Sequence, residues 1–227
     1  MVASDDRSDD RNVRRAALGG IVGPAAFVGS WATLGFVKTG YSPLHDPISD
    51  LAGVHASTRV AMSAGFVVFG AGMGLYAWAL RRALPGPAWI AAATTGAATV
   101  GVAAFPLHHS STIDAVHGAF ATAGYVTLAA TALASATQLA RLGHHRWARG
   151  AATAGVVSAV SLALTLNGSF EGFFQRAGLT AGDVWIVAST IAIRRGYWTR
   201  GPYAPERRRG PRFARSGTTS AEESPSR

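Results

Sequence analysis

The sequence contains no cysteine among its 227 residues, and only 15% of its residues are charged. The first absence excludes disulfide bonds, thiolate nucleophiles and zinc sites built on cysteine. The second is unusual, because soluble domains carry about 25% charged residues. Most of the charge lies in residues 1–15 and 199–227, which lack apolar periodicity and are expected to be disordered tails. The remainder, residues 16–198, is apolar and is expected to form one domain.

The formal net charge is +9, and arginine supplies most of it. Arginines beside apolar segments usually set membrane topology. We therefore expect membrane lipids, and no nucleic acid, as partners of this chain. The first apolar run lacks a small-residue cleavage site, which predicts a retained helix rather than a cleaved signal peptide. The composition indicates no particular protein partner.

A helix crosses the hydrocarbon core of a bilayer in ~20 residues. The apolar segments predict six such helices, and therefore an all-α transmembrane bundle. Their expected ranges are residues 16–37, 60–80, 88–107, 113–139, 147–166 and 179–193, the last extending to 198 if Tyr197 and Trp198 form an interfacial belt. Glycines four residues apart, in Gly19-x-x-x-Gly23 and Gly70-x-x-x-Gly74, predict close contacts between helices.

The distribution of basic residues predicts the orientation of this bundle. Of the 21 lysines and arginines, only Lys38, Arg59 and Arg176 lie in the first, third and fifth connections. All others lie in the tails or in the second and fourth connections. Because cytoplasmic loops carry the excess of lysine and arginine, both termini are expected in the cytoplasm of a multi-pass protein of the cell membrane.

Ionisable groups gather on the opposite, outer side. The first connection contains "YSPLHDPISDLAGVH" (41–55), and the third contains "FPLHHSSTIDAVHG" (105–118). Together they hold five of the seven histidines. Two acids have a structural interpretation, because Ser111 with Asp114, and Thr180 with Asp183, have the spacing of a capping box. Capping does not explain the histidines, so the sequence predicts a polar site on the outer face.

His117 and Asp114 lie three residues apart and would share one face of a helix. With Ser49 they are the candidate catalytic residues, for proton transfer and nucleophilic attack. Histidines also suit zinc, and the candidate metal ligands are His45, His109 and His117. The sequence has no H-E-x-x-H spacing, so these ligands would come from separate loops. A structural histidine bound to a backbone carbonyl remains the alternative for His117.

The fifth connection, "NGSFEGFFQRAG" (167–178), is expected to be an interfacial turn, because phenylalanines surround its polar residues. Arg176 is expected either to form an internal salt bridge or to bind a phosphate or carboxylate group. The candidate ligand-binding residues are Tyr41, Asp50, His109, Glu171, Gln175 and Arg176.

Three stretches, in their order and spacing, resemble the domain-of-unknown-function 998 family of small bacterial and archaeal membrane proteins. They are "GYSPLHDPISDLAG" (40–53), "FPLHHSSTIDAVHG" (105–118) and "EGFFQRAGLTAGDVW" (171–185). The resemblance spans about residues 16–195. It implies a six-helix membrane domain with no established activity. The residues that recur in the family would correspond here to Ile48, Ser49, Phe105, Pro106, His117, Gln175 and Arg176.

Three classes of function stay open at this point. The first is binding, sensing or transport of a small amphiphile or lipid, which polar clusters in membrane bundles often serve. The second is a membrane-embedded hydrolase, with or without a metal, that acts on lipid or envelope material. The third is a structural or assembly partner without a ligand. The sequence does not decide whether the protein is an enzyme, and it identifies no cofactor.

Overall fold

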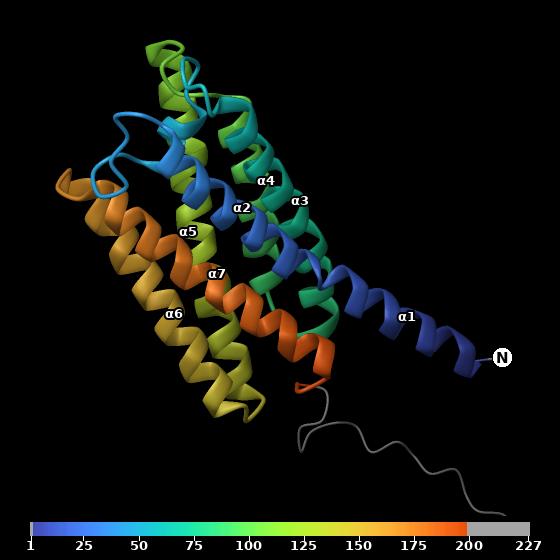
Figure 1. Ribbon diagram of the computed structural model, residues 1–227. Helices are drawn as coiled ribbons and strands as arrows, with labels where there is room; N and C mark the ends of the chain where they lie inside the picture. Colours follow the sequence, from blue (N-terminus) through green and yellow to red (C-terminus); the bar gives the residue numbers. More distant parts are fainter. Residues whose placement is uncertain (1, 199–227) are drawn as a thin grey trace, which may run out of the picture.

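The computed structural model describes residues 2–198, with side chains from residue 8 onward, and this part of the chain contains helices and loops but no strand. The expected disordered tail at residues 199–227 lies outside the described residues. The elements in chain order are α1 (Val2–Ala16), α2 (Gly19–Val37), the 3₁₀ helix η1 (Ile48–Ala52), α3 (Arg59–Ala83), α4 (Ala88–Ala104), α5 (Ser111–Arg141), α6 (His145–Leu164), the 3₁₀ helix η2 (Thr165–Asn167) and α7 (Glu171–Arg195) (Figure 1).

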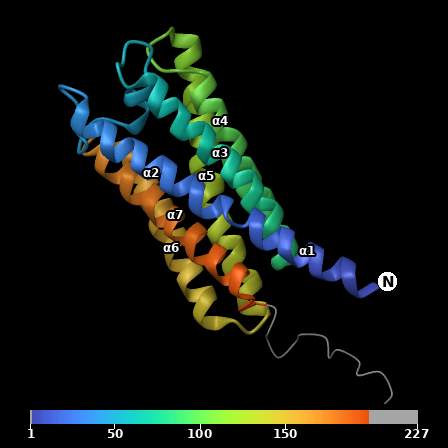
Figure 2. The same cartoon turned by 45° about the vertical axis from the view of Figure 1, so that its right-hand side comes forward.

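The N-terminal residues form helix α1 rather than the disordered tail expected from the sequence. Opposite charges four residues apart, such as Asp10 and Arg14, favour a helix in this polar segment. Asp9 Oδ2 also lies 3.1 Å from Arg82 Nη1 at the end of α3, although both side chains are half exposed. After a short break at residues 17–18, α2 continues the chain into the bundle (Figure 2).

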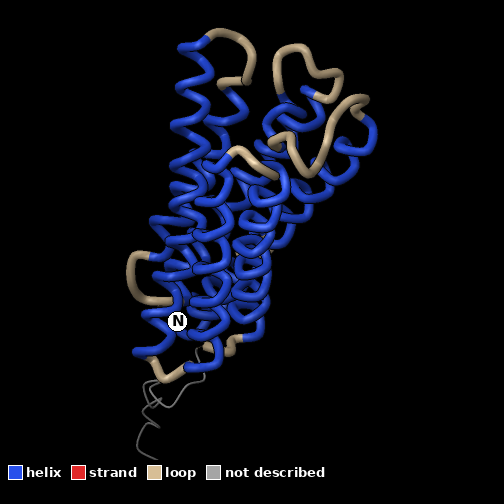
Figure 3. Tube along the Cα trace, turned by 90° about the vertical axis from the view of Figure 1, so that its left-hand side faces the viewer, coloured by secondary structure: helices blue, strands red, loops and turns tan. Residues whose placement is uncertain are grey.

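Six helices, α2 to α7, form the bundle, and each packs mainly against the next in the chain. Helix α7 closes the ring against α2 through a smaller contact than those between neighbours in the chain. The helices run along one common direction, with loops at both ends (Figure 3). Tyr76, Met73 and Ile186 are fully buried between them. The bundle therefore has one interior, bounded by the six helices.

Glycines bring several backbones into contact, as the sequence predicts. A Cβ on Gly72 would lie 2.6 Å from the carbonyl oxygen of Gly19, so no larger residue fits between α2 and α3 without a shift. A Cβ on Gly96 would likewise lie 2.7 Å from the carbonyl oxygen of Gly70. Gly74, which the sequence pattern pairs with Gly70, faces open space instead.

Four helical segments are long and apolar enough to cross a membrane: Ser8–Val37, Arg59–Ala83, Ser111–Arg141 and His145–Asn167. Helix α4 is apolar but shorter. Large apolar side chains such as Phe36, Val60 and Leu75 are exposed on the outside of the bundle. A soluble protein rarely exposes apolar side chains on this scale, so the chain has the surface and helices of a membrane protein.

Helix α7 differs from its prediction. It begins at Glu171, eight residues before the expected start at Leu179, and it takes up most of the segment expected as an interfacial turn. Phe170 and Gly168 before it both have positive φ, which turns the chain sharply into the helix. Because of the earlier start, Asp183 lies in the middle of α7 and does not cap it with Thr180. Gln175, Arg176 and Asp183 are buried within this helix.

Candidate functional site

The loop between α2 and α3, residues 38–58, folds back into one end of the bundle. At this end, called the loop end below, the α4–α5 and α6–α7 connections also lie (Figure 1). Pro47, in an extended conformation, precedes the short helix η1. Ile48 and Leu51 in η1 are no more than 1% exposed, and Ser49 is 7% exposed. The loop is therefore part of the interior, and it closes the bundle at this end.

Two side chains near the start of α7 hold this loop. Gln175 Oε1 accepts a hydrogen bond of 2.7 Å from the Ile48 N–H. Arg176 Nη1 donates to the carbonyl oxygens of Pro43 at 2.8 Å and Asp46 at 3.1 Å. The same nitrogen donates to the Gly172 carbonyl, 2.8 Å away, within α7. A planar guanidinium has enough donors to satisfy several acceptors at once, so one side chain fixes the course of the loop.

The expected salt bridge of Arg176 is replaced by these carbonyl bonds, since no carboxylate lies within 4.0 Å of it in the described part of the chain. Its second terminal nitrogen donates to the Tyr41 hydroxyl. The guanidinium also lies over the Trp31 ring, 5.3 Å from the centroid. Burial raises the pKa of Tyr41, although the adjacent Arg176 opposes that shift. Tyr41 therefore stays a neutral phenol that accepts from the guanidinium.

His117 and Ser49 meet beneath the loop. His117 Nε2 lies 2.9 Å from Ser49 Oγ, and Nδ1 lies 2.7 Å from the Phe105 carbonyl oxygen. A carbonyl oxygen can only accept, so Nδ1 carries the proton and Nε2 accepts from the Ser49 hydroxyl. His117 is 4% exposed. The two residues thus have the orientation of a nucleophile and its general base, with a backbone carbonyl where a carboxylate often orients the base.

Asp114 does not join this pair, although the sequence predicts one shared face with His117. Its Oδ1 accepts a hydrogen bond of 2.9 Å from the His108 N–H, which fixes the preceding turn. His108 needs this support because its φ is 66°. The N-cap of α5 is Ser110, whose hydroxyl accepts from the Ile113 N–H. Asp114 therefore serves the turn and the first turn of α5.

The expected metal ligands do not come together. No group of three or more histidine, aspartate or glutamate side chains in the described residues is placed to hold a metal ion. His45 stacks on Phe170, with ring centroids 5.1 Å apart. His109 is exposed on the loop before α5. Both ring nitrogens of His117 already have partners, which leaves no free lone pair for a metal.

The remaining candidates lie at the rim of the loop end. Asp50 Oδ1 lies 3.1 Å from His108 Nε2, and the Asp50 carbonyl accepts from Lys38 Nζ at 2.8 Å. Glu171 begins α7 and is partly exposed. The Asp50–His108 contact joins the α2–α3 loop to the α4–α5 connection, and the Asp50, Lys38 and His108 side chains have their bonds away from the Ser49 hydroxyl and the His117 ring.

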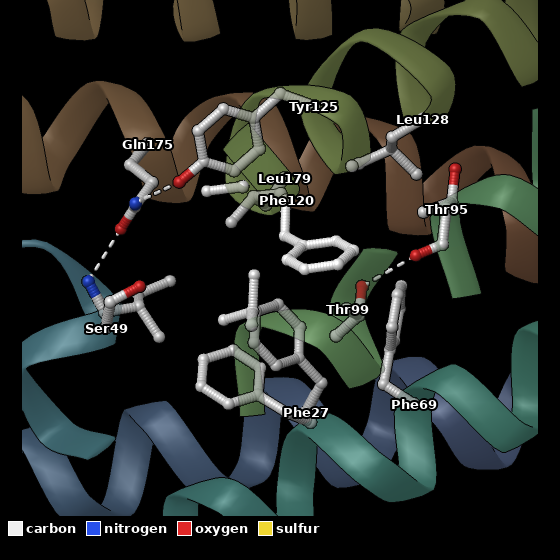
Figure 4. A pocket seen from close by; sticks show the side chains of 15 residues that line it. Phe27, Ser49, Phe69, Thr95, Thr99, Phe120, Tyr125, Leu128, Gln175 and Leu179 are labelled. Carbon is white, nitrogen blue, oxygen red and sulfur yellow. Dashed lines mark hydrogen bonds between the residues drawn. The ribbon is translucent and has the colours of Figure 1, made fainter. Parts of the chain in front are cut away.

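An internal cavity lies below Ser49 and Gln175 (Figure 4). Its volume is about 50 Å³, enough for ordered water but not for a larger ligand. Polar groups from Ser49, Gln175 and Tyr125 lie at one end, and Thr95 and Thr99 lie farther in (Figure 4). Aromatic rings form much of the remaining wall, contributed by Phe27, Phe66, Phe69 and Phe120.

Sequence reasoning missed Tyr125, whose hydroxyl accepts a hydrogen bond from Gln175 Nε2. It also lines a second hollow, a groove of about 500 Å³ between α5 and α6. The polar side chains of this groove, Thr122, Tyr125 and Thr165, lie toward the loop end, and its deeper lining is apolar. Tyr125 thus separates the cavity from a groove on the bundle surface. The one sequence signal for this residue was the presence of a tyrosine within an otherwise apolar stretch of α5.

Replacing Arg176 with lysine is expected to lower the free energy of unfolding by about 2 kcal/mol or more, because one ammonium leaves some of the buried carbonyls unsatisfied. Unfolding of the purified protein in detergent measures the loss. Proteolysis within residues 41–55 should also become faster. The matched control is Arg59→Lys, at an exposed position at the start of α3. Equal effects of the two changes would contradict the anchoring role of Arg176.

The comparison with protein families agrees with the architecture. Residues 21–192 match the model of a family described as "Protein of unknown function (DUF998)". No similar protein was found among the curated proteins, and no similar fold among the solved structures. The matched range covers well over half of the chain and includes the α2–α3 loop, His117 and the start of α7. The chain therefore belongs to the DUF998 family.

Proposed function

We propose that this protein crosses the cell membrane six times, with both termini in the cytoplasm, and binds a single-chain amphiphile whose neutral polar head lies at the loop end. Four helical segments meet the length and hydropathy expected of membrane spans. Helix α7 has 25 residues, long enough to cross, and its polar side chains Gln175, Arg176 and Asp183 are buried. Ionisable residues inside a membrane usually face the bundle interior in this way.

The orientation can be tested directly because the chain contains no cysteine. Single cysteines at His109, on the loop end, and at His145, on the opposite end, are both at exposed positions. A membrane-impermeant maleimide should label the His109→Cys variant on intact cells, and the His145→Cys variant only after permeabilisation. Labelling of both variants on intact cells, or the reverse order, would rule out the proposed topology.

The groove between α5 and α6 supports the proposal of an amphiphilic ligand. Its volume of about 500 Å³ suits a chain, and its polar side chains lie at one end. Tyr125 lines both this groove and the internal cavity. An acyl chain lying in the groove would therefore place the ligand's head group beside Tyr125, close to Gln175 and Ser49. This graded lining is the observation that carries the proposal.

The polar side chains at this end of the cavity, Ser49, Gln175 and Tyr125, determine which head group of an amphiphile can bind. None of the residues lining the cavity is charged. Arg176, the nearest guanidinium, already donates to loop carbonyls and to Tyr41. Ser49, Tyr125 and Gln175 already bond to protein groups, but the Ser49 oxygen can still accept, and the Tyr125 hydroxyl and the second Gln175 N–H can still donate to a ligand. Such groups pair with hydroxyl, ester or amide heads, as in a monoacylglycerol.

Monolaurin is a suitable probe, since it joins two hydroxyls and an ester to a single chain. It should raise the melting temperature of the purified protein in neutral detergent in a concentration-dependent manner. Leu133→Trp, which fills the deep part of the groove, should abolish the shift. Leu75→Trp, on the exposed face of α3, is the matched control and should keep it. No shift with the wild type, or equal shifts with both variants, would refute the binding site.

A second function is favoured by one observation, the hydrogen bond from the Ser49 hydroxyl to His117 Nε2. In an ester hydrolase, Ser49 Oγ would attack the carbonyl carbon while His117 accepts its proton. The alcohol would leave with that proton, and water would then release the acid from the acyl-serine. The Tyr125 hydroxyl accepts from Gln175, so its own proton is available to the developing oxyanion.

A fluorophosphonate probe distinguishes hydrolysis from binding alone. The hydrolase predicts covalent labelling at Ser49, lost in Ser49→Ala and slowed at least ~100-fold in His117→Asn, because general-base assistance contributes about that much. Ser57→Ala, an exposed serine on the same loop, should label normally. If the wild type resists the probe and does not release laurate from monolaurin, the Ser49–His117 pair is not a hydrolytic site.

A further inference from the structure

A carboxyl group without a partner lies in the middle of α7. Asp183 is the central residue of Glu171–Arg195, about 18 Å from either end at the rise of an α-helix. The side chain is 4% exposed. Neither carboxyl oxygen has a hydrogen-bond partner among the described residues. Buried polar groups are nearly always paired, so this carboxyl calls for a partner from outside the described part of the chain.

Asp183 lines a groove of about 440 Å³ between α7 and α2. These two helices lie side by side in both views of the ribbon (Figures 1 and 2). The other lining residues are apolar except for Thr180, and they are Ile21, Pro24, Ala25, Val28, Val184, Val187, Ala188 and Ile191. The groove is thus an apolar trough with one acidic group.

Helices α2 and α7 contact each other on either side of the groove along their length. Toward the loop end, Arg176 of α7 lies over the ring of Trp31 of α2. Toward the other end the helices touch, since a Cβ on Gly20 would collide with Thr190 Oγ1. Arg176, Asp183 and Thr190 are spaced seven residues apart and therefore share one face of α7. An occupant must enter from the side, through the surface of the bundle.

The chemistry of the trough restricts what this occupant can be. An ionised carboxylate in an apolar site needs a cation beside it. A bare Mg²⁺ or Ca²⁺ ion needs about six oxygen ligands, and only Thr180 and Asp183 offer side-chain oxygens here. An ammonium group on an apolar chain supplies the charge and N–H donors for both carboxyl oxygens. Its chain covers the apolar wall.

We propose that the groove between α2 and α7 binds a lipophilic primary ammonium ion, with Asp183 as its counter-ion. This site is distinct from the α5–α6 groove and does not depend on the function proposed for it. The two sites differ in the charge of the head group that each selects, and they lie on different pairs of helices.

Octylammonium is the ligand used to test the Asp183 site, and 1-octanol, with the same chain and an uncharged head group, is the control ligand. Octylammonium should stabilise the purified wild-type protein in neutral detergent, and 1-octanol should not. Asp183→Asn keeps the shape of the side chain and removes its charge, and it should weaken octylammonium binding at least about tenfold, the loss of one charged hydrogen-bonded pair. Asp114→Asn, the same change at the loop end, should bind normally. Equal shifts with the amine and the alcohol, or an unchanged affinity in Asp183→Asn, overturn the proposal.

A second measurement uses the wild type alone, so it stands even if Asp183→Asn fails to fold. Dicyclohexylcarbodiimide modifies protonated carboxyls that can be reached from an apolar phase. Peptide mass spectrometry should find Asp183 modified in the free protein, and octylammonium should slow that modification at least tenfold while 1-octanol does not. Absence of modification, or modification that octylammonium leaves unchanged, overturns the site.

Discussion

The buried guanidinium of Arg176 is the interaction on which the loop end of this protein depends. It gathers the carbonyls of Pro43 and Asp46 onto the start of α7 and holds the Tyr41 hydroxyl. With the loop fixed in this way, Ile48 reaches Gln175 and Ser49 reaches His117. One side chain therefore positions a loop far away in the sequence, and the Ser49–His117 pair forms beneath that loop.

The general architecture could be predicted from the sequence because apolar length and arginine placement are strong signals. The expected starts of α3 and α4 lie within one residue of those observed. Helix α1 was missed because its stability rests on opposite charges such as Asp10 and Arg14 rather than on an apolar face. The early start of α7 was missed because polar residues among phenylalanines are typical of an interfacial turn as well as of a buried helical turn.

Several residues of the candidate site could be singled out from the sequence, but their bonding partners could not. Ser49, His117, Gln175 and Arg176 were all identified, yet their partners are largely backbone groups, and the sequence does not indicate which carbonyl a side chain will meet. The helical spacing pairs Asp114 with His117. In the structure Asp114 instead accepts a hydrogen bond from the His108 N–H and stabilises the turn in which His108 has a positive φ. Tyr125 was overlooked because a single phenol in an apolar helix leaves the hydropathy almost unchanged.

The order of helices in the ring has a mechanical consequence. Every adjacent pair from α2 to α7 is joined directly by a loop, whereas α2 and α7, the first and last members, meet without one. Helix α2 also follows a break at residues 17–18 and contains Pro24, whose missing N–H weakens the helix where it faces Asp183. The α2–α7 contact is therefore the one contact in the ring of described helices that no loop reinforces, and a tilt of α2 would widen the groove beside Asp183.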